Sequence, residues 1–325
     1  MKYTTKWIAV TGLMALSQWA SALQVPGPVV DTDWLTQNMA EVTVLDIRGN
    51  VKSFTATPQF EADKKSGKKM LVEFGGHIPA AVLVDPKIIR VERTIAGLKV
   101  KYMLPERADF EKMARGWGVQ TGKPIVIVAA GQDAVDQNDA ARLYWQFKVF
   151  GEDNIAIVNG GTTGWLNEGR DVASTATTAA PGNWSGKAER MEYMATSEDV
   201  EKAIASKGAQ LVDARNAQQF LGLSKRDYVF GFGHIPGAQN VPSDLLVTEG
   251  DTPRMLAAAT YRDIFKMSGV DPQAPTITYC NSGHLASGAW FVLSEVLGNK
   301  QTKLYDGSMH EWTLEKRALQ SVARQ

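Results

Sequence analysis

The sequence contains an internal duplication, and this limits the folds that the chain can adopt. Four blocks of the first half recur in the same order in the second half: VLDIR (44–48) as LVDAR (211–215), GHIPAA (76–81) as GHIPGA (233–238), PIVIVA (124–129) as PTITYC (275–280), and VNGG (158–161) as YDGS (305–308). Four matches in one order indicate a tandem duplication. A chain of 325 residues is long enough for two ordinary domains. We therefore expect two copies of one domain.

Each copy alternates short β-branched runs with helical patterns. In the second copy, helices are predicted over 196–206 and 286–297, the first opened by a capping pair of Thr196 and Asp199. Strands that alternate with helices form a parallel sheet covered on both faces, and sites in such sheets lie at the carboxyl ends of the strands. The predicted fold class is α/β, with two tandem domains that are each a parallel sheet flanked by helices.

The two ends of the duplication fix the expected domain boundaries. Two lysines precede a short apolar run, and Ala20-Ser21-Ala22 follows it, which predicts a secretory signal at 1–22 cleaved after Ala22. The run is shorter than the roughly 20 residues of a membrane-spanning helix. We predict a first domain at 23–172, a linker rich in Ser, Thr, Ala and Gly at 173–190, and a second domain at 191–325. The expected location is the bacterial periplasm.

Charge and cysteine content exclude several classes of protein. The chain has 35 basic and 35 acidic residues, and removal of the signal takes away two lysines, which leaves 33 − 35 = −2. Without a basic block, nucleic-acid binding is not predicted. No later segment is apolar enough to span a membrane. A single cysteine excludes an internal disulfide, so the fold must depend on its apolar core.

That single cysteine, Cys280, is the candidate nucleophile. It follows a strand-like run (276–279) and precedes a helical stretch, where unpaired backbone N–H groups and the helix dipole favour a thiolate. The alternative is a small, buried, inert side chain. In the first copy the matching residue is Ala129, and the following loop is acidic and four residues longer, judged from the spacing to Trp165 (36) and from Cys280 to Trp312 (32). The first domain is therefore expected to be a structural partner that shapes one wall of the cleft, or to have a binding role of its own.

Together, these motifs resemble the rhodanese sulfurtransferases of the tandem kind, with an inactive first copy and a catalytic second copy. The resemblance covers about 31–314 and rests on Asp-x-Arg, Gly-His-Ile-Pro-Gly-Ala, Cys-x-x-Gly and Asp-Gly…Trp. It implies that Cys280 takes a sulfane sulfur from thiosulfate or 3-mercaptopyruvate as a persulfide. The acceptor would be cyanide or a thiol, including a thioredoxin-like protein, and no metal or organic cofactor is implied. The alternative is a noncatalytic rhodanese-like module that binds sulfur or a partner.

The loop after Cys280 is expected to surround the persulfide with backbone N–H groups. Gly283 fits a position that needs positive φ. His284, the only ionisable side chain of the loop, is expected to contact the donor or to serve only in packing, and Ser282 to bond the persulfide or to cap the helix. The predicted binding loop comprises Asn281, Ser282, Gly283, His284, Leu285 and Ala286.

Three further residues are expected to support the site rather than react. Asp213 and Arg215 are predicted to form a structural charge pair, because Asp46 and Arg48 persist in the copy without a cysteine. His234, in the Gly-His-Ile-Pro motif, receives the same structural interpretation as its counterpart, His77.

The donor is less well defined by the sequence. Members of the family that use thiosulfate carry cations directly after the cysteine, and those that use mercaptopyruvate carry Gly-Ser-Gly. Asn281-Ser282-Gly283 is closer to the neutral type, but His284 matches neither. The arginine that many members place beyond Asp-x-Arg is Gln219 here. Arg226 is predicted to bind the donor anion in its place, and the alternative is a solvated loop cation.

Two other classes of cysteine enzyme do not fit. Cysteine phosphatases and arsenate reductases of related architecture need Cys-x5-Arg, but Ala286 is the sixth residue after Cys280. A disulfide oxidoreductase needs a second cysteine, and the chain has none.

Overall fold

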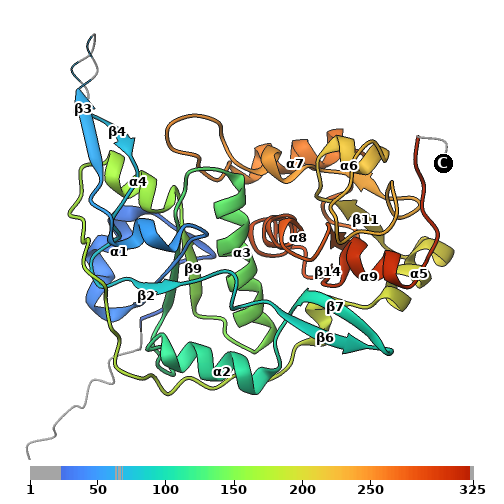
Figure 1. The fold of residues 1–325 in the computed structure, drawn as a ribbon, viewed down its shortest axis with the longest axis horizontal. Helices are drawn as coiled ribbons and strands as arrows, with labels where there is room; N and C mark the ends of the chain where they lie inside the picture. Colours follow the sequence, from blue (N-terminus) through green and yellow to red (C-terminus); the bar gives the residue numbers. More distant parts are fainter. Residues whose placement is uncertain (1–22, 63, 65–66, 68, 323–325) are drawn as a thin grey trace, which may run out of the picture.

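The computed structural model of the protein describes residues 23–62, 64, 67 and 69–322 (Figure 1). The predicted signal segment at 1–22 lies outside the described residues. Among the helices that the structure describes, none has the length and apolar character needed to cross a membrane.

The first half contains nine strands, four α-helices and two 3₁₀ helices within its described residues. In chain order these are β1 (Val29–Val30), α1 (Thr32–Asn38), η1 (Met39–Glu41), β2 (Thr43–Ile47), η2 (Val51–Thr55), β3 (Gln59–Ala62), β4 (Lys69–Glu73), β5 (Val82–Val84), β6 (Val91–Ile95), β7 (Leu98–Met103), α2 (Arg107–Gly116), β8 (Ile125–Ala129), α3 (Ala134–Val149), β9 (Ile155–Val158) and α4 (Gly161–Asn167).

The second half is built in the same way with fewer strands. Its described elements are η3 (Met191–Tyr193), β10 (Met194–Ala195), α5 (Ser197–Ser206), β11 (Gln210–Asp213), α6 (Ala217–Leu221), β12 (Gln239–Asn240), η4 (Ser243–Leu246), α7 (Ala258–Met267), β13 (Thr276–Tyr279), α8 (Leu285–Trp290), the π-helical turn η5 (Phe291–Val296), β14 (Thr302–Tyr305) and α9 (Ser308–Leu314).

The two main sheets have the same topology. The strand order is β1-β9-β8-β2-β5 in the first and β10-β14-β13-β11-β12 in the second, and all neighbouring strands are parallel. Even the register agrees, because Asp46 pairs with Val128 as Asp213 pairs with Tyr279. The predicted fold class of two tandem α/β domains is therefore confirmed.

The predicted helices of the second copy also form. Helix α5 begins after Thr196, and its capping box is complete: the Thr196 hydroxyl accepts from the backbone N–H of Asp199, and the Asp199 carboxylate accepts from the N–H of Thr196. The second helix begins at Leu285, one residue earlier than predicted, and continues through the π-helical turn to Val296.

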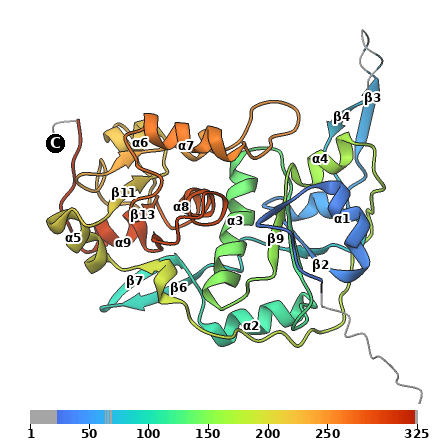
Figure 2. The same cartoon turned by 180° about the vertical axis from the view of Figure 1, so that it is seen from behind.

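A shared central core joins the two halves. Helices α3 and α8 lie side by side between the sheets (Figures 1 and 2). Side chains alternate along each central strand, so Ile127 and Ala129 of β8 face this core while Val128 faces an outer one. Cys280 also belongs to the central core, while Tyr279 belongs to the outer core of the second half. The candidate thiol therefore lies on the face of its sheet directed toward the first half.

Two antiparallel hairpins distinguish the first half from the second. Strands β3 and β4 pair with each other, as do β6 and β7. The β6–β7 hairpin extends across to the second half (Figure 1), where the ring of Tyr102 lies 5.1 Å from that of Tyr228. Through this hairpin, a segment with no counterpart in the second copy reaches the region of Cys280.

The segment between the copies is irregular but packed. Residues 174–190 contain no helix or strand. Trp184 is fully buried and donates from its indole nitrogen to Glu152 Oε2 (2.9 Å), while Arg115 Nε donates to the Trp184 carbonyl (2.9 Å). The predicted linker thus lies along the first half rather than hanging free, because a buried tryptophan anchors it.

Candidate functional site

Cys280 follows β13 directly and lies at the base of a cavity of about 280 Å³ between the two halves. Its side chain is almost completely buried. Both halves line the cavity, with Arg90, Tyr102 and Val135 from the first and Arg226, Tyr228, Cys280, Asn281, Ser282, His284 and Leu285 from the second. The first half therefore shapes one wall of this cleft.

The hydroxyl of Ser308 organises the loop after Cys280. Ser308 Oγ accepts hydrogen bonds from the backbone N–H groups of Cys280 and Gly283, both at 3.1 Å, and donates to the Tyr305 carbonyl at 2.8 Å. Gly283 has φ +72°, which confirms the predicted left-handed turn. One hydroxyl thus joins the two ends of the segment from Cys280 to Gly283.

Several backbone donors of this loop remain free. The N–H groups of Asn281, Ser282 and His284 have no acceptor among the described residues. Helix α8 begins directly after them, and the first N–H groups of a helix also lack partners within the helix. A concave run of such donors favours an anion, whether a thiolate or a terminal persulfide sulfur.

The side chain of Asn281 forms a hydrogen bond within the protein. Its Nδ2 donates to Gln219 Oε1 at 2.8 Å, and both side chains are buried. Gln219 therefore contacts the loop through its side-chain oxygen and brings no charge to it.

Two guanidinium groups lie on opposite walls of the cavity. Arg226, the predicted donor-binding residue, comes from the second half and is exposed. Arg90 comes from the first half and lies 5.4 Å from the centre of the Tyr102 ring. Burial, together with the neighbouring Arg142, lowers the pKa of Arg90 from its ordinary value. The cavity is thus lined by a largely buried cation, Arg90, and an exposed cation, Arg226, and such a pair of guanidinium groups can bind an anionic ligand.

Sequence reasoning missed Arg90. It lies between β5 and β6, in a stretch without a repeated block, and its proximity to the cysteine arises only when the halves pack. No local motif marks such a residue, so the sequence contains no signal that distinguishes Arg90 from other arginines of the first half.

His284 and Ser282 both line the cavity, but each also has a protein partner. His284 Nε2 lies 2.7 Å from Asp139 Oδ1 of helix α3 in the first half. Ser282 Oγ is 3.5 Å from the Tyr228 hydroxyl, and burial raises the pKa of Tyr228, as does the nearby Cys280. The ionisable side chain of the loop thus lies beside a carboxylate of the half that has no cysteine, although the ring nitrogen does not form a hydrogen bond with it.

Asp213 and Arg215 lie behind the loop in the fully buried position expected of a structural pair. Arg215 donates to both Asp213 oxygens, at 2.7 Å from Nη2 and 3.0 Å from Nε, and Nη2 also donates to the Gly233 carbonyl at 2.8 Å. His234 stacks on Phe220 and its Nδ1 lies 2.7 Å from the Phe220 carbonyl oxygen.

The first copy repeats this arrangement. Arg48 bonds both oxygens of Asp46 and the Gly76 carbonyl, and His77 stacks on Phe54. Neither Asp-x-Arg pair lines the Cys280 cavity. The geometry therefore matches a supporting role, in which the pair joins the strand to the Gly-His-Ile-Pro turn.

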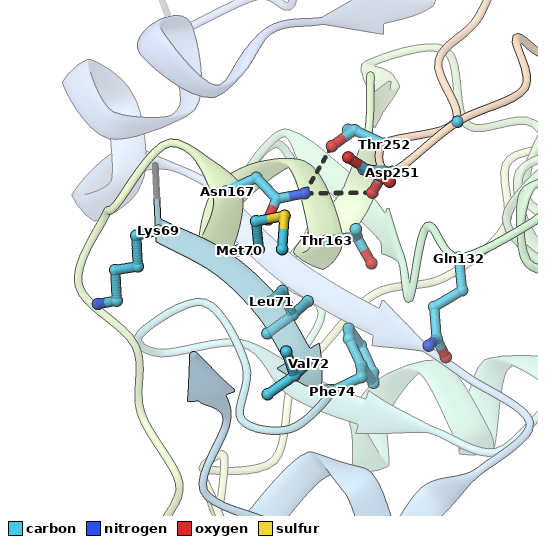
Figure 3. Close-up of a pocket in the computed structure, with 11 residues that line it drawn as sticks. Lys69, Met70, Leu71, Val72, Phe74, Gln132, Thr163, Asn167, Asp251 and Thr252 are labelled. Carbon is cyan, nitrogen blue, oxygen red and sulfur yellow. Dashed lines mark hydrogen bonds between the residues drawn. The ribbon is translucent and has the colours of Figure 1, made fainter. Parts of the chain in front are cut away.

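A second cavity, of about 430 Å³, lies beside the matching edge of the first sheet (Figure 3). One wall is formed by Met70 and Val72 of strand β4 and by Phe74 just after it. A loop of the second half closes the cavity, where Asn167 Nδ2 donates to Thr252 Oγ1 at 2.7 Å. Its lining residues include no cysteine or histidine. This cavity is larger than the one at Cys280 but contains no nucleophile comparable to the thiol.

Among the described residues, no three His, Cys, Asp or Glu side chains are grouped as metal ligands.

The chain is similar in sequence to known sulfurtransferases. The model of the rhodanese-like domain matches residues 196–315. A putative thiosulfate sulfurtransferase of Haloferax volcanii is 31% identical over 211 residues, which cover 63% of this chain and 71% of the relative. The 3-mercaptopyruvate sulfurtransferase of Mus musculus is 31% identical over 248 residues, which cover 73% and 76%.

A solved structure extends the similarity to both halves. The crystal structure of SseA from Escherichia coli, a 3-mercaptopyruvate sulfotransferase, superimposes with a TM-score of 0.68 at 26% identity and covers 87% of this chain and 98% of its own.

Proposed function

Because the chain belongs to the rhodanese family and is a sulfurtransferase, we propose that it carries the transferred sulfur as a persulfide on Cys280. The donor is an anionic sulfane compound, thiosulfate or a mercaptopyruvate-like molecule. The acceptor is cyanide or a thiol.

The observation that carries this proposal is the position of Cys280. It is the only thiol of the chain, and it lies at the base of a cavity beside free N–H groups. Attack by the thiolate on the terminal sulfur of thiosulfate forms the new S–S bond, breaks the old one and releases sulfite. With mercaptopyruvate the thiolate attacks the thiol sulfur, the C–S bond breaks, and pyruvate leaves as its enolate, which takes up a proton. A second thiolate or cyanide then removes the outer sulfur and restores the Cys280 thiolate.

The cavity walls support an anionic donor. Arg90 and Arg226 face the cavity from the two halves, while the loop itself contributes no full positive charge directly after the cysteine. A guanidinium pairs in bidentate fashion with a carboxylate or with two thiosulfonate oxygens. Both donors of the proposal contain such a group.

Intact mass spectrometry tests the persulfide. After incubation with thiosulfate or 3-mercaptopyruvate and desalting, we expect one added sulfur atom on the wild-type protein and none on Cys280→Ser. Treatment with dithiothreitol or cyanide should remove the added mass, which separates a persulfide from a sulfinic acid of nearly equal mass, since the latter resists thiols. If neither donor yields a reversible adduct, the persulfide proposal fails and a noncatalytic sulfur-binding or partner-binding module is favoured.

The choice of donor needs steady-state kinetics. A comparison of kcat/KM for thiosulfate and for 3-mercaptopyruvate, with cyanide as acceptor, ranks the two. The neutral Asn281-Ser282-Gly283 sequence leads us to expect the higher value with 3-mercaptopyruvate.

We also propose that the enzyme works after export to the periplasm and that a thioredoxin-like protein is one of its acceptors. The first part rests on the lysines, apolar run and Ala20-Ser21-Ala22 of the N-terminal segment. Amino-terminal sequencing of the protein from the periplasmic fraction is expected to begin at Leu23. Replacing cyanide by a reduced thioredoxin in the assay tests the second part.

A further inference from the structure

We propose that Arg142, a residue of the cysteine-free first half, positions the Cys280 loop, so that the site of the second half is complete only with this arginine in place. This inference rests on the proposed role of Cys280. Arg142 is a positioning residue here, because it does not line the cavity.

The first contact is direct. Arg142 lies on helix α3 and is completely buried. Its Nη1 donates to the Gly283 carbonyl at 3.2 Å and lies 2.5 Å from Asp306 Oδ1. The guanidinium carbon lies 4.6 Å from the centre of the Trp145 ring, which adds a cation–π contact.

The second contact passes through Asp306. The other carboxylate oxygen of this residue, Oδ2, accepts from the backbone N–H of Leu104 at 2.6 Å, so two groups of the first half bind one aspartate of the second. Asp306 precedes Ser308 by two residues, and the Ser308 hydroxyl binds the N–H groups of Cys280 and Gly283. The cysteine loop is therefore held at a carbonyl by Arg142 and at two amides by a turn that Arg142 also holds.

The first copy shows what this contact looks like without a cysteine. Its counterpart of Asp306 is the neutral Asn159, whose Oδ1 accepts from the N–H of Met255 at 2.8 Å, in the way that Asp306 accepts from Leu104. The nearby Arg254 contacts Asn159 only at its carbonyl, at 3.4 Å, and pairs instead with Glu168 at 2.8 Å; its side chain is 38% exposed. Only the copy with the thiol combines the backbone contact with a fully buried ion pair.

The same helix provides a matched control. Lys148 is also a buried cation of α3; its Nζ pairs with Asp153 of the first half and lies 3.7 Å from Glu295 of the second half. Lys148→Met therefore removes a buried ion pair across the same interface without touching the Cys280 loop. Loss of a buried cation is expected to lower stability in both variants, but more in Arg142→Met, because Glu295 keeps Lys300 and Asp153 keeps Arg190 as partners, whereas Asp306 is left without a cation among the described residues. The midpoint of unfolding of each variant is therefore measured beside its reactivity.

The experiment measures the rate of alkylation of Cys280 by iodoacetamide across pH in the full-length wild-type, Arg142→Met, Arg142→Lys and Lys148→Met proteins. A disordered loop presents its amides less well, so we expect Arg142→Met to react about tenfold more slowly at neutral pH, with its pH profile moved up by about one unit. Arg142→Lys is expected to lie between the two, and Lys148→Met to match the wild type. In the sulfur-transfer assay, Arg142→Met should lower kcat and leave KM for the donor nearly unchanged.

Two results would overturn the inference. One is an Arg142→Met protein that alkylates at the wild-type rate, and the other is an equal loss of reactivity in Lys148→Met. If Arg142→Met does not fold, Arg142→Lys decides by the same comparison. Failure of the wild type to take up sulfur would contradict the proposed function instead, and alkylation would still decide the role of Arg142.

Discussion

At the scale of single residues, Ser308 has an unusual backbone. Its φ is +50°, in the left-handed region that residues other than glycine rarely adopt. Its counterpart in the first copy is Gly161, with φ +57°. A strained serine costs about 1–3 kcal/mol relative to an unstrained residue. The hydroxyl of Ser308 gives a reason for the serine, since it binds two amides of the cysteine loop.

We predict that Ser308→Gly separates stability from activity. The glycine relieves the backbone strain, so the midpoint of chemical unfolding should stay the same or rise, while the loss of the hydroxyl frees the Cys280 and Gly283 amides and lowers kcat about tenfold or more. Unfolding and kinetics on one preparation check this. Ser308→Ala serves as control, because it loses the hydroxyl but keeps the strain. A Ser308→Gly protein with full activity would show that the hydroxyl is dispensable.

At the scale of elements, the cavity depends on segments that come from different places in the chain. Arg226 lies in the loop after α6, and Arg90 lies between β5 and β6 of the other half. Neither segment belongs to the repeated blocks, so the two cations come together through packing of the halves rather than through the topology of either sheet.

Kinetics of two variants test whether each half contributes a donor-binding cation to the cavity. We predict that Arg226→Ala and Arg90→Ala each raise KM for an anionic donor by about tenfold or more, since a hydrogen bond to a charged group contributes about 1.5–3 kcal/mol. The effect of Arg90→Ala should be the larger, because Arg90 is less exposed than Arg226. Lys225→Ala is the control: its ammonium lies over the ring of Phe232 and outside the cavity lining, so KM should not change. If KM is unchanged in Arg226→Ala, Arg226 does not bind the donor and is a solvated loop cation.

The repeat explains why much of the fold was predictable and part of the site was not. Asp46 and Asp213 occupy the same register, so comparison of the copies placed the strands, the Gly-His-Ile-Pro turns and the strand that ends at Cys280. Arg90 and Arg142 act across the interface, where the copies differ, and contacts between unlike segments leave no local pattern in a single sequence. The hairpin β6–β7 was unpredicted for the same reason.

At the scale of the whole molecule, the two halves share one central core, although the duplication suggests two separate domains. Buried side chains of both halves, such as Trp145 and Trp290, belong to one continuous cluster around α3 and α8. The packed segment at 174–190 adds a further connection along the surface of the first half. Each half therefore relies on the other for part of its buried surface.

We predict a single unfolding transition for the whole chain. Because separation of the halves exposes the shared core, far-UV circular dichroism and tryptophan fluorescence should give coincident curves in guanidinium, and calorimetry should show one peak whose van't Hoff and calorimetric enthalpies agree. Lys148→Met should shift this transition without splitting it. Two separated transitions would show that the halves fold independently.

The burial of α3 from Asn138 to its C-terminal end has a consequence for the substitutions that the protein can tolerate. Its residues from Asn138 to Val149 are all buried, although the domain that contains them has no thiol. A genetic screen for loss of sulfur transfer would therefore recover many substitutions in this helix, and natural drift in the cysteine-free half would be slowest there. Along this helix, the cysteine-free half is thus expected to be as intolerant of substitution as the core of the half that contains Cys280.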